Sequence, residues 1–430
     1  MPGDNNVIES VDHLFRRHAG QMTAVLTRIF GFGKIDLIED AIQESMLRAL
    51  SHWSYKGLPD NPRAWLIQVA KNNILDRLRK SSRDADLEEE SKLLDAWARS
   101  AGSNIDAAFE KEIREDQLQM IFACCHPALT PDSRIALTLK TVGGFSVTEI
   151  ATAFLSNKEA VAKMLVRAKK KLRDEGARME IPVPSELRPR LESVLKVLYL
   201  MFNEGYSASG GEIAVRTDLC HEAIRLAKLL ADHPLTSQPK VHALAALFLF
   251  QASRLPARSG EGGTLIVLPD QDRTLWNREM IGDGLRHFRA SASGGEISDY
   301  HIEAEIASYH AVSEDYGSTD WNSLLDAYDR LMAVRPSPIA ALNRIIALAE
   351  VEGEDKALNE LQSLADEKLE AYYPYHVTLA ELQRRTGRRE EALRSYEFAA
   401  GLVENAATRC FIEEKIEGIR SRGSLEEHSL

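Results

Sequence analysis

One stretch of the chain combines dense positive charge with a helical pattern. Residues 158–173 contain seven lysines or arginines and a single acid, Glu159. Cationic side chains on a helix face can neutralise DNA phosphates, while the first residues of such a helix can reach base edges in the major groove. The residue types and their spacing therefore indicate DNA binding.

The residues before this stretch predict the element that would position it. The pair Thr130-Pro131 is typical of a helix start, and Gly143-Gly144 would end that helix. Ser146 and Glu149 have the spacing of a capping box, which opens a second helix. A break at 156–158 then leads into the basic helix, so the segment predicts a helix-turn-helix.

A second polar surface lies nearer the N-terminus, on a helix expected to begin at Pro62 with Asn61 as its N-cap. Its candidate nucleic-acid contacts are Lys71, Asn72, Asp76, Arg77 and Arg79. Trp53, Tyr55 and Trp65 surround the preceding loop, where stacking on a single-stranded base is worth about 1–3 kcal/mol. A core role for the two tryptophans is the alternative interpretation.

The formal charge of −12 argues at first against a nucleic-acid partner. Its distribution changes that conclusion, because residues 1–180 are neutral overall and residues 181–430 carry the whole excess of acid. Within the first part, residues 84–116 hold eleven acids and four bases. Two mildly basic modules therefore flank an acidic connector, and an acidic body follows.

The 430 residues suggest two to four domains, and helical periodicity with little alternation predicts an all-α fold. One short β-branched run, at 264–268, could be an isolated strand or a buried loop. Four cysteines without a disulfide framework predict a reducing compartment. No signal peptide pattern and an apolar run (241–252) too short to span a bilayer then predict a cytoplasmic protein outside the membrane. No cofactor, metal or catalytic site is expected, so the chain is not expected to be an enzyme.

The C-terminal part contains a degenerate repeat. Residues 341–361 parallel residues 375–396, with Gly353 and Gly387 at matching turns. A period near 34 residues with helix, glycine turn and helix is the pattern of tetratricopeptide (TPR) repeats.

Two segments together resemble a known family. DLIEDAIQESMLRALSHW followed by NPRAWLIQVAKNNILDRLRK is similar to region 2 of bacterial extracytoplasmic-function (ECF) sigma factors, and LTPDSRIALTLKTVGGFSVTEIATAFLSNKEAVAKMLVRAKKKLR is similar to their region 4. The strings LYLMFNEGYSAS, ASRLPARS and LPDQDRTLW resemble the helical extension of one ECF subgroup. The expected domains are region 2 at 8–83, an acidic linker at 84–111, region 4 at 112–178, a helical extension at 186–295 and TPR-like repeats at 296–420.

The resemblance implies promoter-specific initiation with bacterial core RNA polymerase, bound through its β′ clamp and β flap, on promoter DNA. The implied polymerase contacts are Asp40, Gln43, Glu44 and Leu47, for which solvated helix acids are the alternative at Asp40 and Glu44. The implied −10 contacts are Asn61, Arg63, Trp65, Lys71, Asn72, Asp76, Arg77 and Arg79. The implied −35 contacts are Thr148, Ser156, Lys158, Glu159, Lys163, Arg167 and Lys170.

Three other groups invite functional interpretations that the sequence favours less. Cys124-Cys125-His126 suggests a metal or redox centre, but adjacent cysteines cannot easily bind one zinc ion, so packing is favoured. The polar group at 270–273, with Arg254 and Arg258, could be a ligand pocket or a structural salt-bridge network, and the network is favoured. His301, Glu303, Glu305 and His310 lack a metal-binding motif.

Three rival functions remain open. A helix-turn-helix regulator with a TPR sensor would need no polymerase contact, a TPR scaffold would not need the basic bias of 158–173, and a hidden enzyme would rest on the 270–273 group. The charge order also suggests that the acidic extension masks the basic faces within one molecule.

Overall fold

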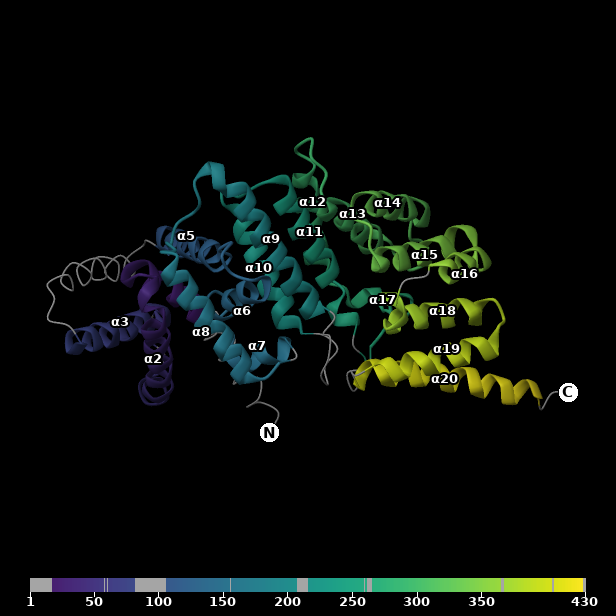
Figure 1. The fold of residues 1–430 in the computed structure, drawn as a ribbon, viewed down its shortest axis with the longest axis horizontal. Helices are drawn as coiled ribbons and strands as arrows, with labels where there is room; N and C mark the ends of the chain where they lie inside the picture. The colour runs from purple at the N-terminus through teal and green to yellow at the C-terminus, as the bar shows by residue number, and fades with distance from the viewer. Residues whose placement is uncertain are drawn as a thin grey trace. The chain divides into compact units, whose positions relative to one another are not determined.

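A computed structural model shows the fold (Figure 1). The structure describes residues 18–57, 59, 61–81, 106–154, 156–206, 216–258, 260, 265–364, 367–403 and 406–427. These residues form helices and no strand, which confirms the predicted all-α fold. Most of the predicted acidic linker lies outside the described residues. No described helix is both long enough and apolar enough to cross a bilayer.

The chain divides into two compact units, which we call unit 1 (Met1–Leu200) and unit 2 (Met201–Leu430). A helical segment at 18–30 opens the described part of unit 1. The helices that follow are α2 (Ile35–Lys56), α3 (Pro62–Ser81), α5 (Asp106–Cys124), α6 (Pro131–Thr141), α7 (Val147–Ala153), α8 (Lys158–Asp174) and α9 (Pro184–Tyr206), whose last turns belong to unit 2.

Helices α2 and α3 pack against each other and the 18–30 segment around an apolar core. The periodicity correctly predicted the buried faces, since Ile38 and Ala41 of α2 and Ala70 and Ile74 of α3 are fully buried. Asn61 caps α3 as expected, because its Oδ1 accepts a hydrogen bond of 3.0 Å from the Ala64 backbone. The core thereby fixes which faces of α2 and α3 remain exposed.

Capping residues define the helix-turn-helix. Thr130 caps α6, and Ser146 and Glu149 form the complete capping box of α7. Asn157 caps α8 by accepting from the Ala160 backbone at 2.8 Å. Gly144, with φ of 72°, supplies the left-handed turn between α6 and α7 that a larger residue would adopt only with strain.

Helix α9 also packs into unit 1. Arg190 donates to the Phe122 carbonyl oxygen at 2.5 Å, and Arg134 of α6 donates to the Ser193 hydroxyl at 3.1 Å. Leu191, Val194 and Leu195 are buried. The compact unit that carries the helix-turn-helix therefore extends well into α9.

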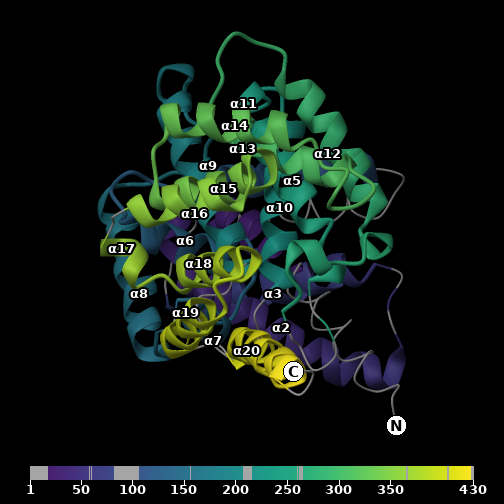
Figure 2. The ribbon, with the colours of Figure 1, turned by 90° about the vertical axis from the view of Figure 1, so that its right-hand side faces the viewer.

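Unit 2 is a succession of packed helices. Its helices after α9 are α10 (Thr217–Asp232), α11 (Pro239–Ala252), α12 (Arg278–Ser291), α13 (Asp299–Val312), α14 (Trp321–Val334), α15 (Pro338–Glu352), α16 (Glu354–Ser363), α17 (Glu367–Glu370), α18 (Tyr373–Arg385), α19 (Arg389–Leu402) and α20 (Ala406–Glu427). The long apolar run at 241–252 is the central helix α11, which packs against α10, α12 and α13. Figure 2 shows α14, α15 and α16 as neighbours in this succession.

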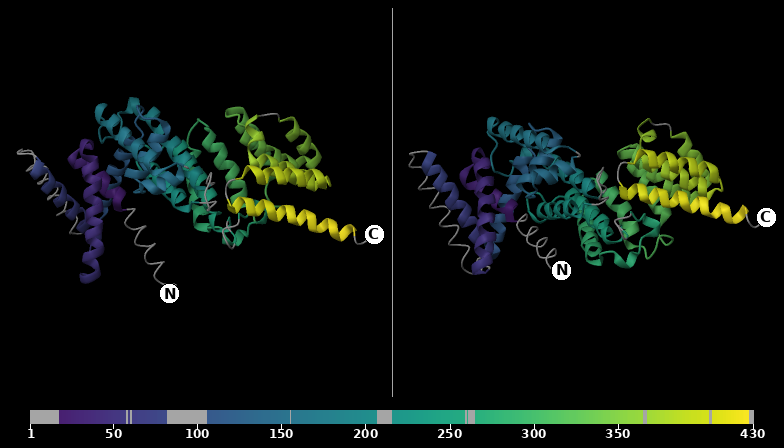
Figure 3. Two further views of the ribbon diagram at one scale, coloured as in Figure 1. Left: turned by 60° about the horizontal axis from the view of Figure 1, so that its bottom comes forward. Right: turned by 90° about the horizontal axis from the view of Figure 1, so that it is seen from below.

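The two helix–glycine–helix units of the repeat are present. Gly353 between α15 and α16 has φ of 95°, and Gly387 between α18 and α19 has φ of 77°. Ala357 and Ala392, at matching positions, are completely buried where the helices approach. Figure 3 shows the yellow helices α18 to α20 side by side. Assignment of these units to the TPR family stays a prediction.

The β-branched run at 264–268 is a loop in its described part. Leu265 and Val267 are half-buried and pack against the core formed by α18, α19 and α20. A short 3-10 turn, η4 (Leu268–Asp270), follows. In its described part the run has a single bridge residue, Leu265, and no strand, and its apolar side chains cover a helical core.

Candidate nucleic-acid interface

The front of α8 carries unpaired positive charge. Every residue predicted for −35 recognition is exposed: Thr148, Ser156, Lys158, Glu159, Lys163, Arg167 and Lys170. Among the described residues, the four cations in this set form no ion pair with a carboxylate. The buried face holds Val161, Leu165 and Leu172, so the apolar core orients the cations outward. This surface can exchange counterions for DNA phosphates without first breaking internal salt bridges.

The rear of α8 serves the fold. Lys169 is buried, with its Nζ 2.9 Å from both Asp36 Oδ1 and Glu39 Oε2 of α2, and Arg173 lies 3.0 Å from Asp36. Burial by itself would lower the pKa of Lys169, but the charge and hydrogen bonds of Glu39 and Asp36 raise it. Lys169 therefore remains charged and joins the two predicted DNA-binding modules within unit 1.

Arg77 of α3, unlike the cations at the front of α8, forms ion pairs with acids of α2. Arg77 lies 3.0 Å from Glu44 and 3.6 Å from Asp40 of α2, and Asn73 also donates to Glu44. The hydrogen bond from Asn73, followed by one from Arg48, lowers the pKa of Glu44. A residue predicted to contact DNA is thus paired with two residues predicted to contact polymerase.

The prediction for Lys71 as an outer-face residue is wrong. Its side chain is 2% exposed, while its neighbour Asn72 is exposed. The apolar face of α3 includes Ile67 and Ile74, which are three or four residues from Lys71, so this position turns inward with them. Lys71 is consequently unsuited to direct phosphate contact in this arrangement.

The other predicted −10 residues are accessible to different degrees. Asp76, Arg77 and Arg79 are exposed, and an ion pair of 3.7 Å joins Asp76 to Arg79. Asn61, Arg63 and Trp65 are partly buried at the start of α3. Among the predicted polymerase contacts, Asp40, Gln43 and Leu47 are exposed, and Leu47 is 67% exposed, which is unusual for a leucine in a helix.

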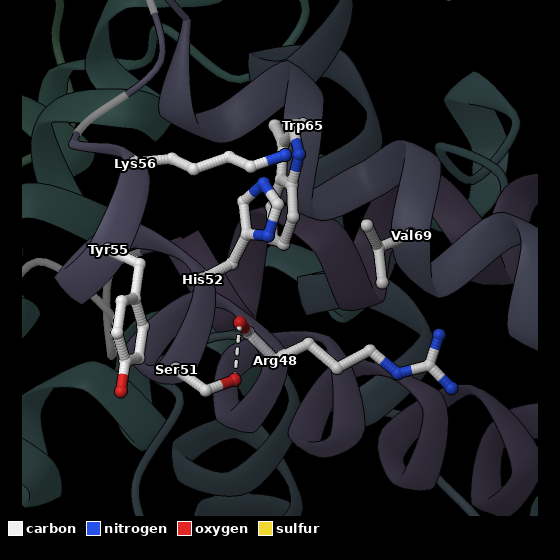
Figure 4. Close-up of a pocket in the computed structure, with 7 residues that line it drawn as sticks. All are labelled: Arg48, Ser51, His52, Tyr55, Lys56, Trp65 and Val69. Atoms are coloured by element: carbon white, nitrogen blue, oxygen red, sulfur yellow. Dashed lines mark hydrogen bonds between the residues drawn. The ribbon is translucent and has the colours of Figure 1, made fainter.

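An aromatic pocket lies where α2 ends and α3 begins. It has a volume of about 510 Å³. Its lining residues are Arg48, Ser51, His52, Tyr55, Lys56, Trp65 and Val69 (Figure 4). The rings of His52 and Trp65 stack with centroids 5.5 Å apart, and Trp53 packs against Trp65 at the same distance. Tyr55 is 95% exposed. The pocket offers flat rings and two cationic side chains, which suit an unstacked base with its phosphate.

The core interpretation of the two tryptophans is confirmed, and base stacking stays a prediction. Trp53 and Trp65 pack against the core, yet Trp65 also lines the pocket. The set of predicted site residues missed His52 and Lys56, because their common surface with Tyr55 appears only when α2 and α3 are packed together. The spacing of His52, Tyr55 and Lys56 at three and four residues was the available signal.

The remaining candidates have structural surroundings. Cys124 and Cys125 are buried beside the hydroxyls of Thr141 and Thr138, and burial raises the pKa of the Cys125 thiol to about 11. No group of three metal-ligating side chains occurs among the described residues. His301 caps α13 through a 3.1 Å contact with the Ser298 backbone.

Among the described residues, the favoured salt-bridge network at 270–273 is absent. Asp270 pairs with Lys415, and Asp272 caps the 3-10 turn η5 (Arg273–Leu275). Arg273 instead donates to the backbone carbonyls of His310 and Ser313. Nearness along the chain therefore did not produce pairing among these described residues.

Comparisons with known proteins agree with the two-module architecture. Residues 14–84 match the model of sigma-70 region 2, residues 119–172 match that of sigma-70 region 4, and residues 190–292 match a family of unknown function (DUF6596). An uncharacterized protein from Rhizobium meliloti (strain 1021) is 37% identical over 388 residues, which cover 90% of each chain. No solved structure matches the chain.

The helix-turn-helix, the region 2 fold and these matches define a sigma-70 type factor for promoter-directed transcription initiation. The chain belongs to this family as an ECF-like sigma factor with a C-terminal extension. Sigma factor families are not enzymes.

Proposed function

We propose that the chain binds bacterial core RNA polymerase and directs it to promoters by recognising both a −10 and a −35 element. The exposed front of α8 supports the −35 assignment. Thr148 lies at the start of α7. Ser156, Lys158 and Glu159 lie at the turn and the start of α8, from which side chains reach base edges. Lys163, Arg167 and Lys170 then hold the phosphates.

The aromatic pocket provides the −10 function. A base extruded from the melted strand stacks on the exposed Tyr55 or on Trp65, and Lys56 neutralises its backbone, whereas Arg48 is already paired with Glu44. Asn61, Arg63 and Asn72 lie on the same helix start or the adjoining face of α3 and would contact neighbouring nucleotides. Asp76 and Arg79 would face the upstream duplex.

Core polymerase would bind the exposed side of α2. Asp40, Gln43 and Leu47 follow one another at three- and four-residue spacing, so they form a single strip on the helix. Leu47 supplies exposed apolar area and Asp40 supplies charge to this strip. Glu44, paired with Arg77, would fix its edge. We assign the strip to the β′ clamp and region 4 to the β flap.

Simultaneous binding of both elements requires unit 1 to open. Elements named −10 and −35 lie roughly 25 base pairs apart, or roughly 85 Å at ~3.4 Å per pair. Helix α8, with 17 residues, is only about 26 Å long, and its Lys169 contacts Asp36 of α2. The contact of Lys169 with α2 therefore belongs to the protein without polymerase. Binding to polymerase would separate region 2 from region 4.

The aromatic pocket is the observation that carries this function over a helix-turn-helix regulator with a TPR sensor. A duplex-reading regulator needs no pocket for an unstacked base. The decisive experiment is transcription in vitro from genomic promoter fragments with purified core polymerase. Tyr55→Ala should abolish open-complex formation while retaining duplex binding, whereas Phe398→Ala, another exposed aromatic residue, should be active. Promoter binding without any polymerase-dependent transcript would instead establish the regulator.

We infer that the extension regulates or supports this activity in the cytoplasm, and its acidic composition suits masking of the basic faces. A truncated chain for this test should end at Tyr206, because α9 packs into unit 1. Tighter DNA binding by the truncated chain supports masking. Weaker transcription makes the extension a required part of the initiating complex.

A further inference from the structure

The front of α8 presents a large apolar side chain among its cations. Val166 is 62% exposed, whereas Val161, Leu165 and Leu172 of the same helix are buried. Its branched side chain also favours the helix less than alanine or lysine would. A single exposed valine is ordinary on a protein surface, but this one stands among the cations assigned to DNA.

Helical spacing places Val166 on the same face as the cations proposed to hold phosphates. Lys163 precedes it by three residues, Arg167 is adjacent and Lys170 follows by four. All three cations are exposed and form no ion pair with a described residue. Unpaired positive charge attracts a polyanion, so DNA is the partner that this face favours over an apolar protein surface.

The position of Val166 along α8 keeps it within reach of bases. It lies eight residues after Lys158, the first residue of the helix, which is about 12 Å along the axis at 1.5 Å per residue. The major groove is itself about 12 Å wide. Glu159, which is proposed to reach base edges, stands seven residues earlier, or nearly two full turns. Val166 and Glu159 therefore project from the same side of the helix.

The chemistry of valine limits what it can recognise in the groove. Its side chain has neither a hydrogen-bond donor nor an acceptor, so it cannot pair with the polar positions of a base edge. The apolar group that a base presents in the major groove is the C5-methyl group of thymine. Burying one methyl-sized group changes an equilibrium constant roughly fourfold, which is enough to discriminate between bases.

We propose that Val166 is a specificity-determining residue that packs against the methyl group of a thymine in the −35 element. This inference rests on the proposed contact of α8 with −35 DNA. It goes beyond that contact because the residues predicted for it are all polar or charged. Lys163 and Arg167 hold phosphates beside the valine, and the valine selects the base.

Removing individual methyl groups from the DNA tests the proposal. Holoenzyme formed from the full chain and core polymerase is bound at constant ionic strength to its strongest genomic promoter fragment. Each thymine of the −35 element is replaced in turn by deoxyuridine, which lacks only the methyl group. One replacement should weaken binding about three- to fivefold in an anisotropy competition. Val166→Ala should weaken binding of the unmodified fragment by a similar factor and should abolish the effect of that replacement.

Two control variants separate base reading from charge and from general effects of substitution. Val312→Ala changes another exposed valine, which lies in unit 2, and should leave the methyl response intact. Lys170→Ala should weaken binding of all fragments by a common factor and retain the methyl response, because a phosphate contact carries no sequence information. Val166 is exposed, so its alanine variant should fold, and thermal unfolding checks this.

A methyl effect that persists in Val166→Ala, or none at any −35 thymine, would overturn the proposal. Weaker binding of Val166→Ala to core polymerase without DNA, with an unchanged methyl response, would also refute it and would place the valine against protein. Transcription from the unmodified fragment tests the proposed function separately. Its absence, together with absence of specific promoter binding, would refute both proposals, whereas specific transcription without a methyl effect that depends on Val166 refutes only this one.

Discussion

Helices α3 and α8 are both rich in arginine and lysine, but they use these residues differently. The cations at the front of α8 are exposed and form no ion pair among the described residues. On α3, Arg77 pairs with acids and Lys71 turns inward, although Lys80 is exposed. The comparison teaches that a charged face identifies a binding surface only when the charges are not already used by the fold. On this criterion α8 is a preformed phosphate-binding surface, and region 2 relies more on its aromatic pocket.

The largest effect should follow from removing cations at the front of α8. We expect Lys163→Ala and Arg167→Ala each to weaken binding of a −35 duplex, with a decrease of about 0.9 in the salt slope for the lost phosphate contact. Fluorescence anisotropy across a salt series measures both quantities. Lys171→Ala is the matched control, since Lys171 is exposed on the same helix but pairs with Glu175 at 2.8 Å. Equal losses in control and test would contradict the division of α8.

The rear of α8 should respond in stability and not in DNA affinity. Lys169→Met removes the cation shared by Asp36 and Glu39, and Glu39 is then left largely buried without it. Removing one partner of a buried pair is costly, but Asp36 is more than half exposed, so we expect a loss of about 1–2 kcal/mol in the free energy of unfolding. Denaturant unfolding measures it, with Lys170→Met as the exposed neighbour. A fall in −35 affinity with unchanged stability would place Lys169 in the DNA interface instead.

The sequence predicted most of the helical framework because that information is local. Capping residues such as Ser146 and Asn157 act within one turn, and apolar periodicity assigned the buried face of α2. The two glycine turns of the repeat were predicted in the same way. The sequence did not predict which charged residues form ion pairs, because Lys169 and Arg77 pair with residues on another helix. Lys71 was predicted on the outer face because it is charged, although its spacing from Ile67 and Ile74 places it inward.

The site was predicted in the same uneven manner. The exposed cations of α8 follow directly from the helix period. The aromatic pocket required the packing of α2 on α3, which placed His52 over Trp65. Arg254 and Arg258 follow α11 and Arg273 begins η5, so chain proximity suggested pairing with Asp270 and Asp272 that the fold does not make among the described residues.

Polar groups used by the fold should also produce a pH response in unit 2. His242 and His287 face each other with their Nδ1 atoms 2.9 Å apart, so at least one must be neutral to accept the hydrogen bond. Burial, followed by the charge of His242, lowers the pKa of His287 from 6.5 to about 4. The folded form therefore binds fewer protons than the unfolded chain, and stability should fall as the pH decreases from 6.5 to 4.

Chemical unfolding across this pH range tests the histidine pair. His287→Asn retains a donor for His242 and removes the more strongly shifted group, so its stability should depend less steeply on pH. The variant and the unaltered chain should therefore converge in acid. Parallel curves for the two proteins would show that the pair does not control the response.

The smallest effect is expected at Arg77. This residue tests most directly whether α3 and α8 differ in how they use their charges. Its ion pairs with Glu44 and Asp40 lie at the surface, so Arg77→Ala should cost less than about 1 kcal/mol in stability. If the fold and the polymerase strip use this charge, binding of a −10 single strand should remain nearly unchanged, while affinity for core polymerase should fall as Glu44 loses its partner. Arg79→Ala is the matched control, because Arg79 pairs with Asp76 and not with the acids of α2. A strong loss of strand binding at Arg77 alone would mean that the Glu44 pair opens on DNA, and α3 would then present its charge much as α8 does.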